Sequence, residues 1–409
     1  MRILIVAPHV PYPGVPHAGG AFLLRHLERL SQTCDVTLLV AAPPSARLAL
    51  DKVPAWLRVH EAPPVRPPAW SPPWVSDRVY HRLHDIPPSP SPESLRGLLA
   101  AGLISRARDA DVVELHWSEY ARLAALLRRA GVHTPLIAVT HDVDAEVLAR
   151  RARAYGTRAR RLVLGAMLPW HRKCERRGLN ATNLVLAFKP GDAALIRHLG
   201  VRTPVRVIDP SLDLPAEGAA SHRAPGAVLF TGAFWRREND DGAVWFLHNV
   251  WPAVRSAVPG ATFTLAGAGP STRLRAAAGD AGDVVITGEV PDLLPYYLQA
   301  SVFVAPLHLG GGLKFKVPQA LVCGLPVVCT SVAAEGVVDV APSGTLWAVT
   351  DRPADMAQRV IAALREPEEA AACGRRAAVW ARQHWSFERS TDQLLELYDV
   401  LVRGAPKPV

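Results

Sequence analysis

The stretch Leu307–Val337, LHLGGGLKFKVPQALVCGLPVVCTSVAAEGV, combines a glycine loop, a helix-like run and a second apolar strand. It follows the apolar run SVFVAPL (301–307), and Lys314 comes two residues after Gly310-Gly311-Gly312. Strand, glycine loop, helix and strand in this order are typical of a βαβ unit. Glycine lets backbone N–H groups approach a ligand closely, and a helix N-terminus and a lysine add positive charge. The stretch therefore predicts a binding site for a phosphate or diphosphate.

The spacing excludes two common glycine-rich fingerprints. It is not G-x-x-x-x-G-K-[ST], because no Ser or Thr follows Lys314, and it is not G-x-G-x-x-G. Lys316 lies two residues further on, so two of the six lysines in the chain fall here. We assign the cationic role to Lys314 and expect Lys316 to be an exposed residue on the first turn of the helix.

Length and composition limit the class of protein. With 409 residues, two domains are expected, and 49% hydrophobic with 20% charged residues excludes a disordered chain. No apolar run approaches the ~20 residues that a membrane span needs. The five cysteines are scattered without a C-x-x-C pair, which fits a reducing cytoplasm and no structural zinc. We expect a cytoplasmic globular protein.

The N-terminal half alternates apolar strands with amphipathic helices. Strands are expected at 2–7, 35–41, 57–60, 111–115, 135–140, 183–188 and 205–208. This alternation predicts a doubly wound parallel sheet. The first loop ends in Gly19-Gly20, with a helix expected to follow at 21–32. The two glycines either bring the loop close to a phosphate or an acceptor, or form a turn that needs glycine.

A proline-rich segment interrupts this half. Eleven of the residues 54–92 are proline, and Trp56, Trp70 and Trp74 lie among them. Such a density of proline excludes helix and central strand. The segment is either a surface excursion or a loop that lines an acceptor site.

His141 and Asp142 are expected at the C-terminal end of a strand, where open α/β sheets place ligands. Asp142-Val143-Asp144 has the D-x-D form of some metal sites. Asp109-Ala110-Asp111 has the same form elsewhere in the chain, and Asp144 fits the role of a helix N-cap. We therefore expect no metal here.

A second alternating series begins after a linker at 215–225, which is rich in Ala, Ser, Gly and Pro. Strands are expected at 227–232, 261–266, 283–288 and 301–307, and a long helix at 242–258.

These segments together resemble the retaining glycosyltransferases of the GT-B fold, the family-four type that includes glycogen-synthase-like enzymes. The likeness rests on GGGLKFKVPQALVCGLPVVCT with a later AAEG, on LAGAGP and ITGEVPDLLPY, and in outline on VRVIDPSLDLP. It implies an α/β protein of two doubly wound Rossmann-like domains that face a central cleft. Residues 1–212 would bind the acceptor, residues 213–385 the nucleotide sugar, and a C-terminal helix (386–409) would pack back onto the first domain.

The resemblance implies roles for residues at matching positions. Lys314 and His141 would act at the reacting donor. The donor diphosphate would meet Gly310, Gly311, Gly312 and Leu313. The arginine that the family carries after its first C-terminal strand is missing, and Arg236 or Arg237 is its candidate replacement. The nucleoside would meet Gln319, Glu335 and Gly288, and Gly19-Gly20 would be the acceptor or phosphate loop.

Two positions depart from the family pattern. Gln319 stands where the family has a glutamate that accepts from the ribose hydroxyls, and Gly311 stands where a branch of the family has another glutamate. A glutamine accepts without a charge-assisted bond, so ribose recognition is expected to be altered. Glu335 either contacts a hydroxyl or caps the next segment.

The implied reaction is transfer with retention of configuration, without metal or cofactor. The co-substrate would be a UDP- or GDP-type sugar, and the acceptor a glycan, a lipid-linked glycan or a small molecule. A catalytically weak partner subunit and a nucleotide-sugar epimerase remain as alternatives.

Net charge is +9, and ten Arg or Lys with one acid lie between Arg150 and Arg177. No nucleic-acid motif accompanies them. The segment is either a solvated helix surface or a contact with anionic lipid at the inner face of a membrane.

Overall fold

The computed structural model describes residues 1–15, 17–41, 47–66, 90–154, 158–209, 212, 214–216, 223–281, 283–385 and 387–404. It divides into two compact units. Unit 1 comprises Met1–Pro13, Leu23–Ile208 and Thr391–Val409, and unit 2 comprises Gly14–Phe22 and Asp209–Ser390. Much of the proline-rich segment, with Trp70 and Trp74, and the middle of the expected linker lie outside the described residues.

Unit 1 contains a parallel sheet whose described strands follow the order β3-β2-β1-β4-β5-β6-β7. The strands are β1 Arg2–Ala7, β2 Asp35–Val40, β3 Arg58–Glu61, β4 Val112–His116, β5 Leu136–Thr140, β6 Leu184–Ala187 and β7 Val205–Val207. The central strands β4 and β5 are buried along their whole length, as expected for a parallel sheet covered on both faces. The predicted doubly wound sheet is confirmed.

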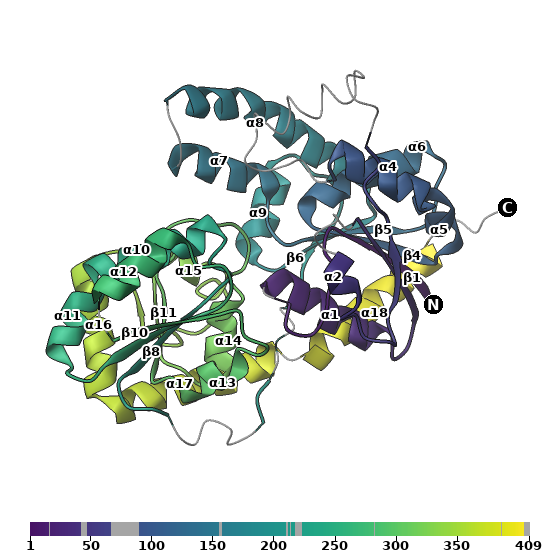
Figure 1. Ribbon diagram of the computed structural model, residues 1–409. Helices are drawn as coiled ribbons and strands as arrows, with labels where there is room; N and C mark the ends of the chain where they lie inside the picture. Colours follow the sequence, from purple (N-terminus) through teal and green to yellow (C-terminus); the bar gives the residue numbers. More distant parts are fainter. Residues whose placement is uncertain are drawn as a thin grey trace. The chain divides into compact units, whose positions relative to one another are not determined.

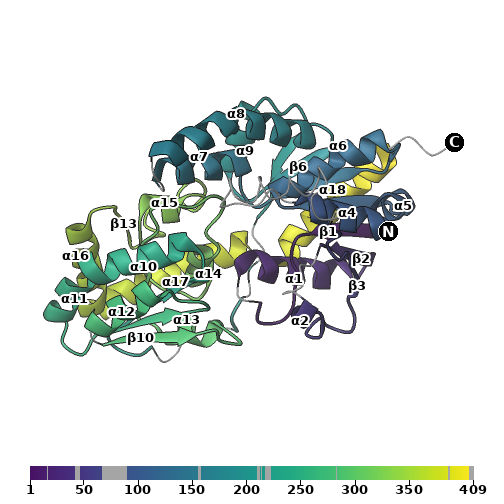
Figure 2. The same ribbon diagram turned by 45° about the horizontal axis from the view of Figure 1, so that its top comes forward.

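Helices connect the strands of unit 1, and a C-terminal helix that follows unit 2 in sequence is added to them (Figures 1 and 2). They are α1 Ala18–Leu30, α2 Arg47–Leu50, α4 Pro92–Ala100, α5 Leu103–Asp109, the 3-10 helix η2 Ser118–Ala121, α6 Arg122–Arg129, α7 Asp144–Ala154, α8 Arg158–Leu179, α9 Pro190–His198 and the C-terminal α18 Phe387–Gly404. Helix α8 continues through Pro169 and packs against α6 and α7.

Two helix starts differ from expectation. Helix α1 begins at Ala18, so Gly19 and Gly20 lie in its first turn, because His17 accepts from the Gly20 N–H through both Nδ1 (3.0 Å) and its carbonyl (3.1 Å). Asp144 is the first residue of α7 and not its capping acceptor. The Glu175 carboxylate accepts from the backbone N–H of Asp144 at 2.9 Å and of the next residue at 3.0 Å.

A buried polar cluster links α18 to the sheet of unit 1. The Tyr398 hydroxyl donates to Glu114 Oε1, while His26 and His116 hydrogen-bond Glu114 Oε2 at 2.8 and 2.9 Å. Burial alone would raise the pKa of Glu114, but the two histidines lower it to about 2. An ionised carboxylate thus holds the C-terminal helix in the unit that contains the first strand.

Unit 2 contains a second parallel sheet, with the order β10-β9-β8-β11-β12-β13 among the described residues. The strands are β8 Ala227–Thr231, β9 Thr262–Ala266, β10 Val284–Gly288, β11 Val302–Ala305, β12 Val327–Cys329 and β13 Ala348–Val349. The helices are α10 Arg237–Asn249, α11 Trp251–Ala257, α12 Thr272–Ala281, α13 Leu294–Gln299, α14 Lys316–Val322, α15 Ser331–Ala334, α16 Pro353–Arg365 and α17 Pro367–His384.

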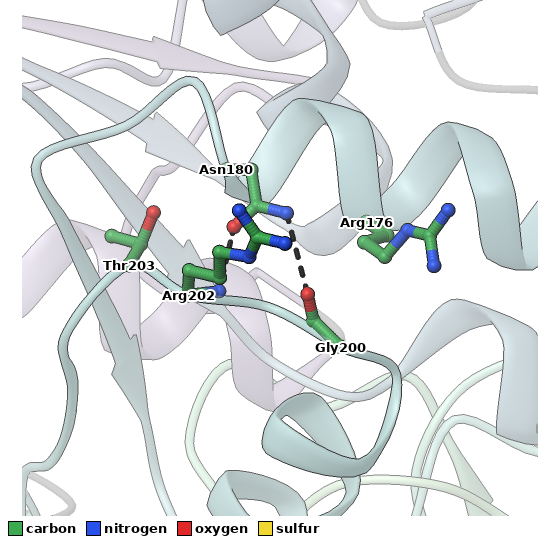
Figure 3. A pocket seen from close by; sticks show the side chains of 5 residues that line it. All are labelled: Arg176, Asn180, Gly200, Arg202 and Thr203. Carbon is green, nitrogen blue, oxygen red and sulfur yellow. Dashed lines mark hydrogen bonds between the residues drawn. The ribbon is translucent and has the colours of Figure 1, made fainter.

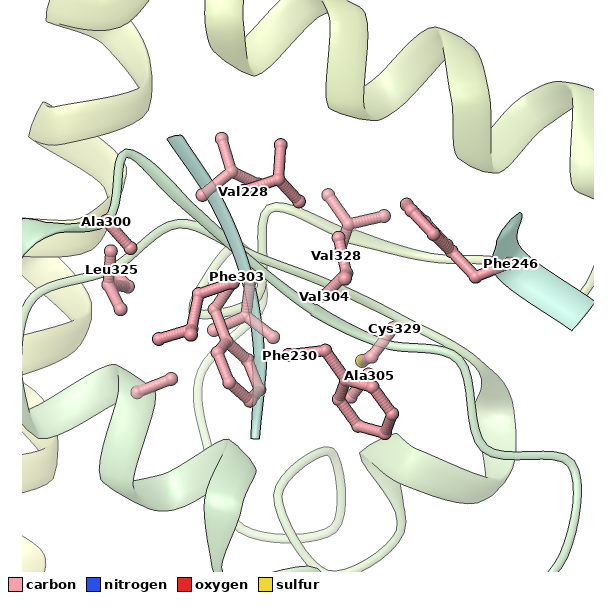
Figure 4. Close-up of a cluster of buried hydrophobic side chains, with 14 of the residues drawn as sticks. Val228, Phe230, Phe246, Ala300, Phe303, Val304, Ala305, Leu325, Val328 and Cys329 are labelled. Atoms are coloured by element: carbon pink, nitrogen blue, oxygen red, sulfur yellow. The ribbon is translucent and has the colours of Figure 1, made fainter. Parts of the chain in front are cut away.

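Helices cover both faces of this sheet, with α10, α11, α12 and α16 on one side and α13, α14 and α17 on the other (Figure 1). The core between them is formed by side chains of β8, β11 and β12 with Phe246 of α10 (Figure 4). The helix predicted at 242–258 is broken into α10 and α11 at Val250. Pro252, which cannot donate into a continuing helix, lies in the first turn of α11.

Candidate functional site

The glycine loop, defined as residues 308–315, connects β11 to α14 in unit 2. Gly310 has φ 137° and Gly312 has φ 62°, conformations that favour glycine. A Cβ at Gly310 would lie 2.9 Å from Cε of Lys314. The loop therefore needs glycine both for its backbone path and for the space that the lysine occupies.

Lys314 is buried within this loop, and its ammonium donates to the carbonyl of Gly312 at 2.9 Å. Leu313 is buried beside it. The loop thus wraps around a cation that lies at the carboxyl end of β11. Parallel α/β sheets bind their ligands at this edge.

Lys316 is not the exposed residue expected from sequence. Its ammonium donates to Asn239 Oδ1 at 2.7 Å and lies 4.5 Å from the centre of the Phe230 ring. A Cβ at Gly232 would lie 2.9 Å from Lys316 Nζ, so glycine there leaves room for the ammonium. Burial, with a further contribution from Arg236, lowers the pKa of Lys316 to about 7. Two lysines therefore converge on the carboxyl ends of the neighbouring strands β8 and β11.

The two candidate arginines differ in position. Arg236 is close enough to Lys316 to disfavour its charged form, and its guanidinium lies 3.3 Å from Glu238. Arg237 is largely exposed and forms an ion pair with Asp241 one helical turn further along α10. Of the two arginines, Arg236 is therefore the one whose charge acts on Lys316.

The candidate nucleoside residues lie on three different elements of unit 2. Gln319 is on α14, where its amide donates to Cys323 Sγ at 3.7 Å. Glu335 is the C-cap residue of α15. Gly288 ends β10 with φ 71° and forms an isolated bridge with Gly267. Gly19 and Gly20 belong to the same unit, and Phe22 in the same segment packs its ring 5.9 Å from that of Phe315 in the glycine loop.

His141 belongs to unit 1, where it follows β5 in a cluster that we call the aromatic group: His9, Trp117, His141 and Phe188. Trp117 stacks on His141 with ring centres 4.1 Å apart and planes at 13°, and Phe188 lies 5.2 Å from His141. His9 meets Trp117 edge-on at 5.2 Å. The four residues follow β1, β4, β5 and β6, so they gather at the carboxyl edge of four adjacent strands.

Sequence reasoning missed Trp117, which has φ 70° although it is not glycine. A bulky residue in this conformation is strained, and such residues cluster at functional sites. The signal available in sequence was its position directly after an apolar strand, the same signal that selected His141.

Unit 1 contains two further polar features, a buried cluster and a pocket. Among the described residues, His26, Glu114 and His116 are the group whose ligand atoms lie close enough for a metal, all within 4.8 Å, and Glu114 is already hydrogen-bonded by both histidines. A pocket of about 610 Å³ is lined by Arg176, Asn180, Gly200, Arg202 and Thr203 (Figure 3). It lies where β6 and β7 begin, at the opposite edge from His141.

Comparison with known proteins identifies the class. Residues 225–366 match the family model described as Glycosyl transferases group 1. A GDP-mannose-dependent alpha-(1-6)-phosphatidylinositol monomannoside mannosyltransferase from Mycolicibacterium smegmatis is 31% identical over 303 residues, 68% of this chain and 73% of that protein. The chain belongs to the group 1 glycosyltransferases.

Solved structures agree on the fold. Sucrose-phosphate synthase from Thermosynechococcus elongatus superposes with a TM-score of 0.72 at 16% identity, covering 99% of this chain and 100% of that one. HepE from Anabaena, in complex with UDP and glucose, superposes with a TM-score of 0.71 at 13% identity, covering 98% and 100%. These structures confirm the predicted GT-B architecture of two parallel-sheet α/β domains.

Proposed function

We propose that this protein transfers a sugar from a nucleotide diphosphate sugar to an acceptor hydroxyl, with retention of configuration and without a metal. The observation that carries the proposal is that Lys314 and Lys316 converge at the carboxyl ends of β8 and β11, with the charge of Arg236 acting on Lys316. Breaking the sugar–phosphate bond develops negative charge on the leaving diphosphate. Fixed cations in a buried site stabilise such charge effectively.

In this proposal Lys314 turns from the Gly312 carbonyl to the diphosphate when the donor binds. Lys316 becomes fully protonated beside it, because an anion offsets the burial that now disfavours its charge. His141 acts at the donor sugar. A phosphate oxygen of the leaving group takes the acceptor proton on the same face of the sugar, so that no protein base is needed.

The donor is of the UDP or GDP type. The GDP-mannose-dependent relative supports guanine as the base of the donor. The structural neighbour bound to UDP and glucose supports uracil. The mycobacterial relative acts on a phosphatidylinositol monomannoside, which supports a lipid-linked glycan among the acceptor classes.

The test is thermal stabilisation of the protein by UDP, GDP, ADP and their sugars, with Lys314→Ala as the matched variant. A ligand at 100 times its Kd stabilises the folded state by about 2.7 kcal/mol. We expect one base to raise the unfolding midpoint of the wild type and to have little effect on the variant. No shift with any nucleotide would overturn the donor assignment.

The donor identified in this way is then used to follow the reaction and its product. Proton NMR of the product reports the anomeric configuration, and turnover in the presence of EDTA tests metal independence. Tight binding without turnover on any acceptor would favour a partner subunit, and isomerisation of the donor alone would favour an epimerase.

A further inference from the structure

The outward face of α8 combines exposed apolar side chains with a row of cations. Leu162 is 75% exposed and Trp170 is 48% exposed, and Val163 is also exposed. These residues occupy the first two thirds of the helix. The last third carries the exposed cations Arg172, Lys173, Arg176 and Arg177.

The helical period separates this outward face from the packed one. Leu164, His171 and Glu175 recur at the spacing of one helix face and are buried. Leu162 and Lys173 lie on the opposite side of the same helix. Leu162 therefore points away from the packing of α8 against α6 and α7, while the half-exposed Trp170 ring also lies 5.8 Å from the Arg122 guanidinium of α6.

The only acid of α8 is on the buried side. Glu175 accepts from the two backbone N–H groups at the start of α7, and burial raises the pKa of Glu175 to about 8. No exposed Asp or Glu interrupts the cations among the described residues of α8. The outward face is thus uniformly positive beside a protruding leucine and tryptophan.

From this arrangement we infer that α8 docks the protein on an anionic lipid bilayer, lying in the interface. Leucine inserts among acyl chains, tryptophan favours the headgroup level, and lysine and arginine attract anionic headgroups. None of the helices within the described ranges has the length and apolar character needed to cross a bilayer.

The positive charge of α8 favours an anionic lipid as the partner over a second copy of the chain. A two-fold contact through α8 would place one row of cations against the same row of its partner. Like charges brought together in this way repel one another. An anionic bilayer offers both the opposite charge and an apolar layer for Leu162.

The experiment is co-sedimentation of the full chain with vesicles of phosphatidylcholine alone and of phosphatidylcholine with phosphatidylglycerol, without nucleotide sugar or acceptor. The readout is thus independent of the proposed activity. We expect binding to the anionic vesicles, which salt weakens, and little binding to neutral ones. Each cation near the surface contributes about fivefold, so Lys173→Gln with Arg177→Gln should weaken partitioning roughly 25-fold.

Substitution of an apolar residue tests insertion into the bilayer separately from the attraction between charges. Leu162→Gln should weaken binding to the anionic vesicles about fivefold or more, because a leucine that inserts into the bilayer is replaced by a polar side chain. Val379→Gln and Arg352→Gln are the controls, since both side chains are exposed and lie in unit 2. Each variant is first checked for an unchanged unfolding midpoint.

Three results would overturn the inference. The first is a wild type that stays in the supernatant with anionic vesicles, and the second is equal loss of binding in the control variants. The third is retention on immobilised heparin with no binding to vesicles, which would assign the face to a soluble polyanion.

Discussion

The glycine loop of unit 2 and the aromatic group of unit 1 both lie at the carboxyl edge of a parallel sheet, yet they are built differently. The glycine loop and the helix start after it combine positive-φ glycines with two lysines that are close in sequence. The aromatic group depends on ring contacts between residues that follow four separate strands. Local sequence therefore specifies the first site, while only the assembled sheet creates the second.

The two sites also differ in how they hold strain. The positive φ angles of the loop fall on glycines, which adopt them at little cost. In the aromatic group the positive φ falls on Trp117, whose backbone is held there by its surroundings. We therefore expect substitutions in the glycine loop to act mainly through the charge and the space available in the loop. Substitutions in the aromatic group should act through the position of His141.

The largest effect is expected from the loop. Lys314→Ala should lower kcat by about 10²- to 10³-fold, as removal of one group that stabilises transition-state charge typically does. Initial rates at saturating donor and acceptor measure this. Lys52→Ala, a surface lysine near Tyr12, should leave kcat unchanged. Equal rates for wild type and Lys314→Ala would mean that the loop has no part in the chemistry.

Substitution of Lys316 should have the next largest effect on catalysis. Lys316 should also make the stability of the protein depend on pH. Lys316→Met should lower kcat/KM by about 10- to 100-fold, because a second cation is lost from the proposed diphosphate site. The folded pKa of about 7 lies below the ordinary value of 10.5. Between these values the unfolded chain binds a proton that folded Lys316 does not, so this residue makes stability rise with pH in that window.

Binding of the nucleotide should reverse part of this shift. An anionic diphosphate favours the charged ammonium, so donor binding near pH 8 should take up a fraction of a proton. Calorimetry in two buffers of different ionisation enthalpy measures the uptake. Identical uptake by wild type and Lys316→Met would assign the proton to another group.

Much of the fold, and the glycine loop that we propose as the donor site, could be predicted from sequence, because their determinants are local. Apolar runs gave the strands, and the glycine loop was recognised from its spacing. The burial of Lys316 could not be predicted, because it depends on Phe230 and Asn239, more than seventy residues away in the chain. The same holds for Glu175, which caps α7 from the far end of α8.

Substitution of Trp117 should have a smaller effect on kcat. The variants distinguish the role of the Trp117 ring from that of its backbone conformation. Removing an aromatic partner costs about 0.5–1.5 kcal/mol, so Trp117→Ala should lower kcat about 3- to 10-fold with KM for the donor nearly unchanged. Trp117→Gly should lose the same activity but unfold at a higher temperature than the alanine variant, because glycine tolerates φ 70°. Trp117→Phe should recover part of the rate. If all three variants match the wild type, Trp117 does not position His141.

The smallest effect is expected at Gln319. A glutamate there could accept from a ribose hydroxyl through a charge-assisted hydrogen bond, which is stronger than the bond to an amide by about 1 kcal/mol. Gln319→Glu should therefore tighten nucleotide binding about fivefold in calorimetry, and Gln319→Ala should weaken it. The Gln319 amide donates to Cys323, the C-cap residue of α14, so Cys323→Ala separates loss of that contact from a gain at the ribose. If Gln319→Glu weakens binding while Cys323→Ala has no effect, the added charge repels the diphosphate, and Gln319 is the better residue for this donor.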